Sequence, residues 1–123
     1  MKALVVDDSR VAREILGDIL VDLGFDVLKA ADGLEGLQVL RQSDKVGLVL
    51  VDWVMPEMDG VDFIRTVRAD PTLDGVRLMM VTTQTEMPKV ATALDSGADE
   101  YVMKPVTKDM IEEKLKVLGL PVA

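Results

Sequence analysis

The sequence predicts a doubly wound α/β fold, in which a five-stranded parallel sheet carries five helices on both faces. Short apolar runs alternate along the 123-residue chain with longer amphipathic segments. The runs are rich in Val and Leu and show little polar alternation, which is typical of parallel strands covered on both faces. They occupy residues 3–6, 25–30, 48–51, 78–81 and 101–103. Five repeats of strand and helix imply right-handed crossover connections.

Five intervening segments have apolar residues at helical spacing, and most carry a start or stop signal. Gly24 ends the first, and Asp32 with Glu35 forms a potential capping box at the start of the second. The fourth runs from about Thr85 to Gly97, with Pro88 tolerated in its first turn. The apolar stripes of the other four span 11–23, 34–40, 61–67 and 110–118.

Length and composition predict one domain, spanning 1–123 with no attached output domain. Hydrophobic residues make up 49% of the chain, enough for a sizeable core. The longest apolar runs are too short to cross a bilayer, and the first run starts too early to leave room for a signal peptide. We therefore expect a soluble cytoplasmic protein without a membrane partner, present as a monomer or weak dimer.

The charge balance and two missing residue types restrict the chemistry. The net charge is −8, and no basic cluster with aromatic residues occurs, which argues against a nucleic-acid partner. The chain has no Cys and no His, which removes thiolate chemistry and the commonest general base and zinc ligand. Any reaction must use carboxylates, lysines and hydroxyl groups, with or without a bound cation.

Polar residues follow four of the five predicted strands. They are Asp7-Asp8, Asp52, Thr82-Thr83 and Lys104-Pro105, whereas the run 25–30 is followed only by alanine. In an open parallel sheet, the site lies beyond the carboxyl ends of the strands, where the strand order reverses. A strand order of 2-1-3-4-5 brings the four polar ends together and leaves the strand at 25–30, which has no polar end, at the edge of the sheet.

Three clustered carboxylates repel one another by about 1 to 4 kcal/mol per pair at partly wet dielectric values. A hard cation relieves this repulsion, and carboxylates without His or Cys suit Mg²⁺. Lys104 and the hydroxyl group of Thr82 are suited to hold a phosphoryl group. Asp52 follows the central strand and is the best-placed nucleophile. Each residue alone has a structural explanation, such as helix capping for Asp7 and Asp8.

Four segments resemble the signature segments of response-regulator receiver domains of two-component signalling. They read VVDDS at 5–9, VDWVMPEMDG at 51–60, MVTT at 80–83 and GADEYVMKP at 97–105. The resemblance spans the chain and is strongest to the stand-alone, CheY-like chemotaxis type, which has the flavodoxin-like fold. It implies a phosphorelay protein that is phosphorylated by a histidine kinase and is not an enzyme toward other substrates.

The resemblance also implies a role for each matching residue. Asp52 would be the phosphoacceptor. Asp8 and Asp52 would bind Mg²⁺ directly, Asp7 through water, and Val54 through its backbone carbonyl group.

Thr82 and Lys104 would each contact a phosphoryl oxygen. Tyr101 would move inward as Thr82 moves, remodelling the surface of helix 4, strand 5 and helix 5 that an output protein binds. The Lys104-Pro105 peptide bond would be cis.

Three features depart from the chemotaxis pattern: two single positions and one pair. Val54 stands where those proteins have Asn, and Gln84 where they have Glu, so their phosphoryl lifetime does not transfer to this chain. Glu86 and Met87 replace a basic pair in the proteins that bind the flagellar switch, which argues against motor binding.

Two other functions compete with the receiver. A phosphatase of the haloacid-dehalogenase type needs a second acid two residues after its nucleophile, where this chain has Val54. A pseudo-receiver, an interaction module without phosphorylation, would be expected to lack an acid, the threonine or the lysine. This chain retains all of them.

Overall fold

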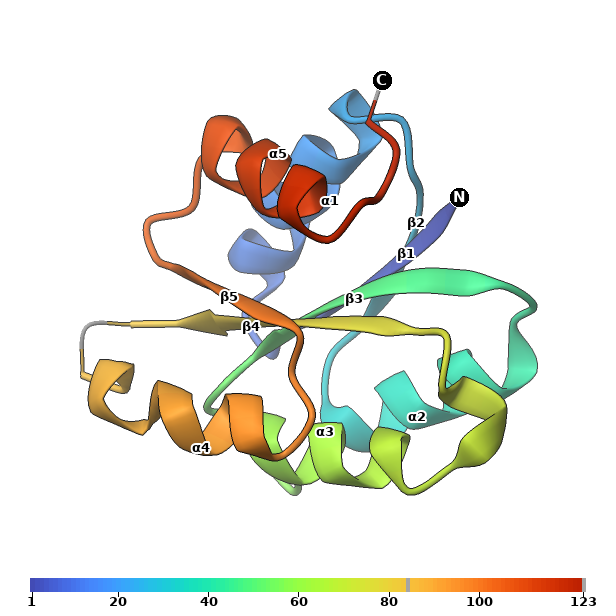
Figure 1. Ribbon diagram of the computed structural model, residues 1–123, viewed down its shortest axis with the longest axis vertical. Coiled ribbons are helices and arrows are strands. Elements are labelled where there is room, and N and C mark those ends of the chain that lie inside the picture. Colours follow the sequence, from blue (N-terminus) through green and yellow to red (C-terminus); the bar gives the residue numbers. More distant parts are fainter. Residues whose placement is uncertain (84, 123) are drawn as a thin grey trace.

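The structure, a computed structural model, describes residues 1–83 and 85–122 and contains one parallel sheet between two layers of helices (Figure 1). The strands are β1 (Lys2–Val6), β2 (Asp26–Ala30), β3 (Val46–Asp52), β4 (Arg77–Thr82) and β5 (Glu100–Met103). Their order is β2-β1-β3-β4-β5, and every neighbouring pair is parallel. The predicted fold class and strand order are confirmed.

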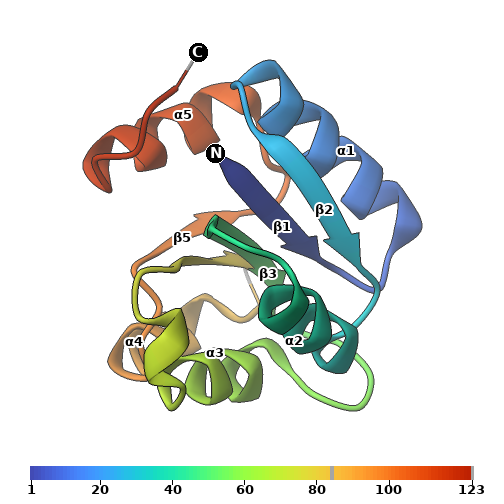
Figure 2. The same cartoon turned by 90° about the vertical axis from the view of Figure 1, so that its right-hand side faces the viewer.

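The helices divide between the two faces of the sheet, as Figures 1 and 2 show. One face carries α1 (Arg10–Asp22) and α5 (Lys108–Val117), and the other carries α2 (Gly33–Gln42), α3 (Gly60–Arg68) and α4 (Val90–Asp95). Because the side chains of a strand alternate between faces, the sheet supports two separate cores. Leu4, Val6, Val49 and Val51 face the α2–α3 side, and Ala3, Val5, Leu48 and Leu50 face α1 and α5.

Local signals set several of the helix ends. The side chains of Ser9, Asp32, Asp59 and Thr107 accept backbone N–H groups at the starts of α1, α2, α3 and α5. Gly24 has φ of 97° just after α1, a conformation that favours glycine. The capping prediction at Asp32 is confirmed in part, because Asp32 Oδ1 accepts the Glu35 N–H at 2.8 Å.

Two details differ from the predictions. The fourth helix, predicted from Thr85 to Gly97, has an α-helical part of only Val90–Asp95, preceded by a 3₁₀ turn at Met87–Lys89. In that turn the N–H of Lys89 bonds to the carbonyl of Glu86, three residues back, and Pro88 has no N–H to extend an α-helical pattern. Strand β2 is also covered less than predicted, because it lies at the sheet edge and exposes Asp26 and Lys29.

Within residues 1–83 and 85–122, no helix is long and apolar enough to cross a membrane.

Candidate functional site

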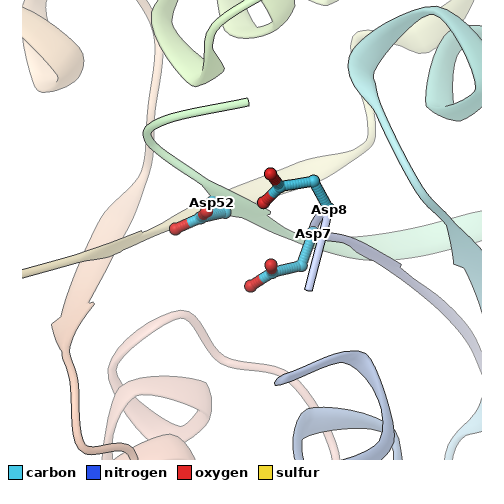
Figure 3. Close-up of side chains that lie close together, drawn as sticks. All are labelled: Asp7, Asp8 and Asp52. Atoms are coloured by element: carbon cyan, nitrogen blue, oxygen red, sulfur yellow. The ribbon is translucent and has the colours of Figure 1, made fainter. Parts of the chain in front are cut away.

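Three carboxylates converge at the carboxyl ends of β1 and β3 (Figure 3). Val6 pairs with Val51 across the two strands, so the next residues along the chain, Asp7 and Asp52, lie side by side at this edge of the sheet. One oxygen from each of Asp7, Asp8 and Asp52 lies within 4.8 Å of the others. Asp7 is fully buried and Asp52 is 8% exposed, whereas Asp8 is exposed to solvent.

Lys104, from the segment after β5, provides the positive charge of this crevice. Its ammonium group lies 3.3 Å from Asp52 Oδ1 and 3.4 Å from Asp7 Oδ2. Burial raises the pKa of Asp52 to about 6; Asp7 and Asp8 act in the same direction, and Lys104 partly offsets them. Burial alone would lower the pKa of Lys104, but the charges of Asp52 and Asp7 outweigh it, and the net shift is upward.

The donor set fits Mg²⁺. An octahedral ion with bonds of about 2.1 Å places opposite ligands about 4.2 Å apart, close to the 4.8 Å limit within which the three carboxylate oxygens lie. The oxygens are hard ligands, and the exposed Asp8 leaves one side open to water or to a phosphoryl group. Asp7, Asp8 and Asp52 are thus the side chains that would hold the ion.

The segment after β3 fixes how Asp52 is presented. Gly60 N–H donates to the carbonyl of Trp53 at 2.8 Å, which closes the loop between β3 and α3. A Cβ atom on Gly60 would lie 2.5 Å from the backbone oxygen of Asp52, so only glycine permits this approach. Val54 lies in this loop with its side chain 65% exposed. Its carbonyl as a metal ligand stays a prediction.

Thr82 ends β4 at the same edge of the sheet. Its side chain is fully buried, and its hydroxyl group donates to the carbonyl of Thr83 at 3.2 Å. The backbone N–H of Lys104 donates to the carbonyl of Thr82 at 2.8 Å, which ties the end of β5 to the end of β4. The Lys104–Pro105 peptide bond is cis. The Thr82 hydroxyl group and the Lys104 ammonium group therefore come from the ends of two neighbouring strands, β4 and β5.

Tyr101 lies on β5, next to this edge, and is partly buried. The Lys114 ammonium of α5 lies 4.9 Å from the centre of its ring and also bonds to Glu100 Oε1 at 3.0 Å. A cation over an aromatic face is attracted by about 0.5–1 kcal/mol at an exposed site. Tyr101 also packs against the core on the α2–α3 side of the sheet, so its ring lies between that core and the Lys114 ammonium group, on the predicted output surface.

Sequence reasoning missed two groups near the crevice. A guanidinium N–H of Arg13 donates to the Asp7 carbonyl at 2.7 Å, and the Thr83 hydroxyl donates to Glu86 Oε2 at the start of the 3₁₀ turn. One feature of the sequence could have identified Arg13: a cation near the start of a helix is unfavourable by about 0.3–1 kcal/mol, unless an acceptor lies close to it. Gln84, singled out for the phosphoryl lifetime, lies outside the described residues.

The sequence model of the response regulator receiver domain matches residues 3–116. The chain therefore belongs to the response regulator receiver domain family.

Several relatives resemble this chain over nearly its whole length. The Chemotaxis protein CheY homolog of Campylobacter jejuni is 41% identical over 97% of this chain and 93% of its own length. Chemotaxis protein CheY1 of Helicobacter pylori (strain J99) is 40% identical over 96% of both chains.

Solved structures agree with this assignment. The chemotaxis protein CheY4 of Vibrio cholerae superposes with a TM-score of 0.86 at 30% identity, covering 94% of this chain and 96% of its own. A probable response regulator/GGDEF domain protein superposes with a TM-score of 0.89 at 27% identity over 95% of this chain. The chain spans about half, 48%, of that second protein.

Proposed function

We propose that this protein is a CheY-like phosphorelay regulator that accepts a phosphoryl group from a histidine kinase onto Asp52. The observation that carries the proposal is the position of the Lys104 ammonium, 3.3 Å from Asp52 and 3.4 Å from Asp7. A structural ion pair needs one carboxylate, whereas this cation lies beside two members of a three-carboxylate cluster. Such a surplus of acids suits a site that also takes Mg²⁺.

In the proposed reaction, one oxygen of Asp52 attacks the phosphorus of the donor's phosphohistidine. The P–N bond breaks, the imidazole leaves, and an acyl phosphate forms on Asp52. Bound Mg²⁺ would neutralise charge on the phosphoryl oxygens. Lys104 offers an ammonium group to one of these oxygens, and Thr82, once its hydroxyl group leaves the Thr83 carbonyl, can donate to another. The chain's own contribution is placement and charge.

The phosphoryl group would signal by changing the surface formed by α4, β5 and α5. Thr82 and Tyr101 would be the moving side chains, with Tyr101 filling space that Thr82 vacates. The named relatives make a role in chemotaxis the first pathway to test. We further propose that 1–123 functions as one receiver in the cytoplasm, as a monomer or weak dimer, with an output protein as its partner.

Phosphorylation by acetyl phosphate tests the proposal without knowledge of the kinase. Intact-mass measurement with acetyl phosphate and Mg²⁺ should show a transient single phosphoryl adduct on the wild-type protein. Asp52→Asn should show none, and Asp18→Asn, which changes an exposed aspartate of α1, should behave as wild type. No adduct should form when Mg²⁺ is chelated before acetyl phosphate is added.

Other outcomes would select the competing functions. No adduct under any condition would indicate an interaction module. Continuous phosphate release from unrelated phosphate esters would indicate a phosphatase.

A further inference from the structure

The exposed carboxylate of the acidic cluster has no support of its own. Within residues 1–83 and 85–122, neither a hydrogen bond nor an ion pair holds the side chain of Asp8. Its two neighbours repel it, because one oxygen of each lies within 4.8 Å. The position of Asp8 therefore depends on its backbone, and mainly on the peptide group that joins it to Asp7.

That peptide group is fixed from the first turns of α1. Its oxygen, the Asp7 carbonyl, accepts a hydrogen bond of 2.7 Å from the Arg13 guanidinium group. The backbone of Arg13 is held to the first turn of α1, because its N–H donates to the carbonyl of Ser9 at 3.0 Å. Ser9 N–H donates to Asp7 Oδ1 at 2.9 Å and closes the ring. Arg13 thus connects the carbonyl of Asp7 to the helix that Asp7 and Ser9 begin.

We infer that Arg13 is a positioning residue that makes the acidic cluster selective for Mg²⁺ over Ca²⁺. Mg²⁺ requires nearly ideal octahedral geometry with short bonds, whereas Ca²⁺ accepts longer bonds and irregular coordination. A cluster whose Asp7–Asp8 peptide group is held still suits the smaller ion. Once that peptide group can rotate, Asp8 can retreat from its neighbours, and the widened cluster loses its preference. This inference rests on the proposed magnesium site.

The test compares Mg²⁺ and Ca²⁺ affinities of the metal-free protein, measured by calorimetry and by the fluorescence of Trp53. In Arg13→Met, which removes the donor but keeps the length of the side chain, Mg²⁺ affinity should fall about tenfold or more. Ca²⁺ affinity should fall clearly less, so the ratio of the two affinities changes. A general loss of stability would lower both affinities together and leave the ratio unchanged.

Arg10→Met is the matched control. Arg10 lies at the first position of the same helix, is exposed, and has no side-chain hydrogen bond or ion pair in the described part of the chain. Arg10→Met removes one positive charge near the same acidic cluster, as Arg13→Met does. We expect Arg10→Met to change the Mg²⁺ and Ca²⁺ affinities by a similar, small factor. If Arg13→Met does not fold, Arg13→Lys supplies the test. It keeps the charge but shortens the reach to the Asp7 carbonyl, and it should show a smaller change in the ratio.

An unchanged ratio in Arg13→Met, or in Arg13→Lys where only that variant folds, would overturn the inference. So would an equal change in Arg10→Met, because the effect would then come from charge alone. The phosphoryl adduct on Asp52 is a separate measurement. If the wild-type protein forms no adduct but its selectivity depends on Arg13, the proposed function is refuted and this inference stands. If the adduct forms but Arg13→Met leaves the selectivity unchanged, this inference is refuted and the proposed function stands.

Discussion

The ammonium group of Lys104 lies 3.3 Å from Oδ1 of Asp52, although the two residues are 52 positions apart in the chain and lie at the ends of strands that are not neighbours. Strand β4 lies between β3 and β5, so Lys104 reaches across its end. The pair is formed in a crevice that also buries Asp7. Burial raises the pKa of Asp52 to about 6, the charges of Asp7 and Asp8 act in the same direction, and Lys104 only partly offsets them. Several measurable consequences arise from this arrangement.

Replacing Asp52 by Asn should stabilise the metal-free protein above pH 6. The unfolded pKa is near 3.8 and the folded pKa near 6, so the unfolded chain ionises first as pH rises. The wild-type protein therefore loses stability between these values, and Asp52→Asn does not. Urea unfolding with a chelator should show a gain on the order of 3 kcal/mol at pH 7.5 that vanishes by about pH 3. Asp18→Asn, which replaces an exposed aspartate, is the control and should lack this pH-dependent gain. If Asp52→Asn also lacked the gain, the raised pKa of Asp52 would be contradicted.

Replacing Lys104 by Met should raise the pKa of Asp52 further in the metal-free protein. The charge and hydrogen bond of Lys104 both favour the ionised carboxylate, and the Met side chain offers neither. The carboxyl ¹³C shift of Asp52, followed by NMR against pH, measures this directly. Lys108→Met removes an exposed lysine at the start of α5 and serves as the control. An unmoved Asp52 titration in Lys104→Met would show that the observed pair is too weak to matter.

Gly60→Ala should destabilise the protein by about 1–3 kcal/mol, because the new Cβ would lie 2.5 Å from the Asp52 carbonyl oxygen and the backbone must shift. Gly75→Ala is the matched control, since nothing lies within 4 Å of a Cβ built there. Thermal and urea unfolding of both variants measure the difference. Equal stabilities would mean that the loop after β3 adapts at little cost. Because this contact would displace the backbone of Asp52 at the end of β3, Gly60→Ala should also slow formation of the phosphoryl adduct.

Thr82→Ala should separate phosphoryl binding from the response of Tyr101. Thr82 is buried, and in the proposed switch its hydroxyl group moves from the Thr83 carbonyl to the phosphoryl group. Tyr101 is the only tyrosine, so a fluorotyrosine label reports its ring by ¹⁹F NMR. The phosphoryl mimic beryllofluoride should shift this signal strongly in the wild-type protein and weakly in Thr82→Ala, although both bind the mimic. A full wild-type shift in Thr82→Ala would exclude this coupling.

The amino-acid sequence was enough to predict the fold class, the strand order and the edge of the sheet at which the polar residues gather. The fold class follows from local signals, namely apolar runs of strand length, helix starts such as the one at Asp32, and consecutive strand–helix units. The strand order follows from the requirement that the four polar strand ends meet at one place. The length of α4 was predicted wrongly, because Pro88 and the turn at Glu86 decide where regular α-helical bonding begins.

The differences among the site residues in burial and in contacts come from how the chain packs in three dimensions. Asp7 and Asp8 are adjacent in the sequence, yet one is buried and the other exposed, because β1 ends between two neighbouring strands and the chain then turns outward into α1. The distances from Lys104 to two carboxylates and the Arg13 contact to the Asp7 carbonyl depend on how strand ends and helices pack. Local sequence patterns carry no such distances. The Lys104 contacts join residues that only the completed sheet brings together, and the Arg13 contact depends on how the chain turns from β1 into α1.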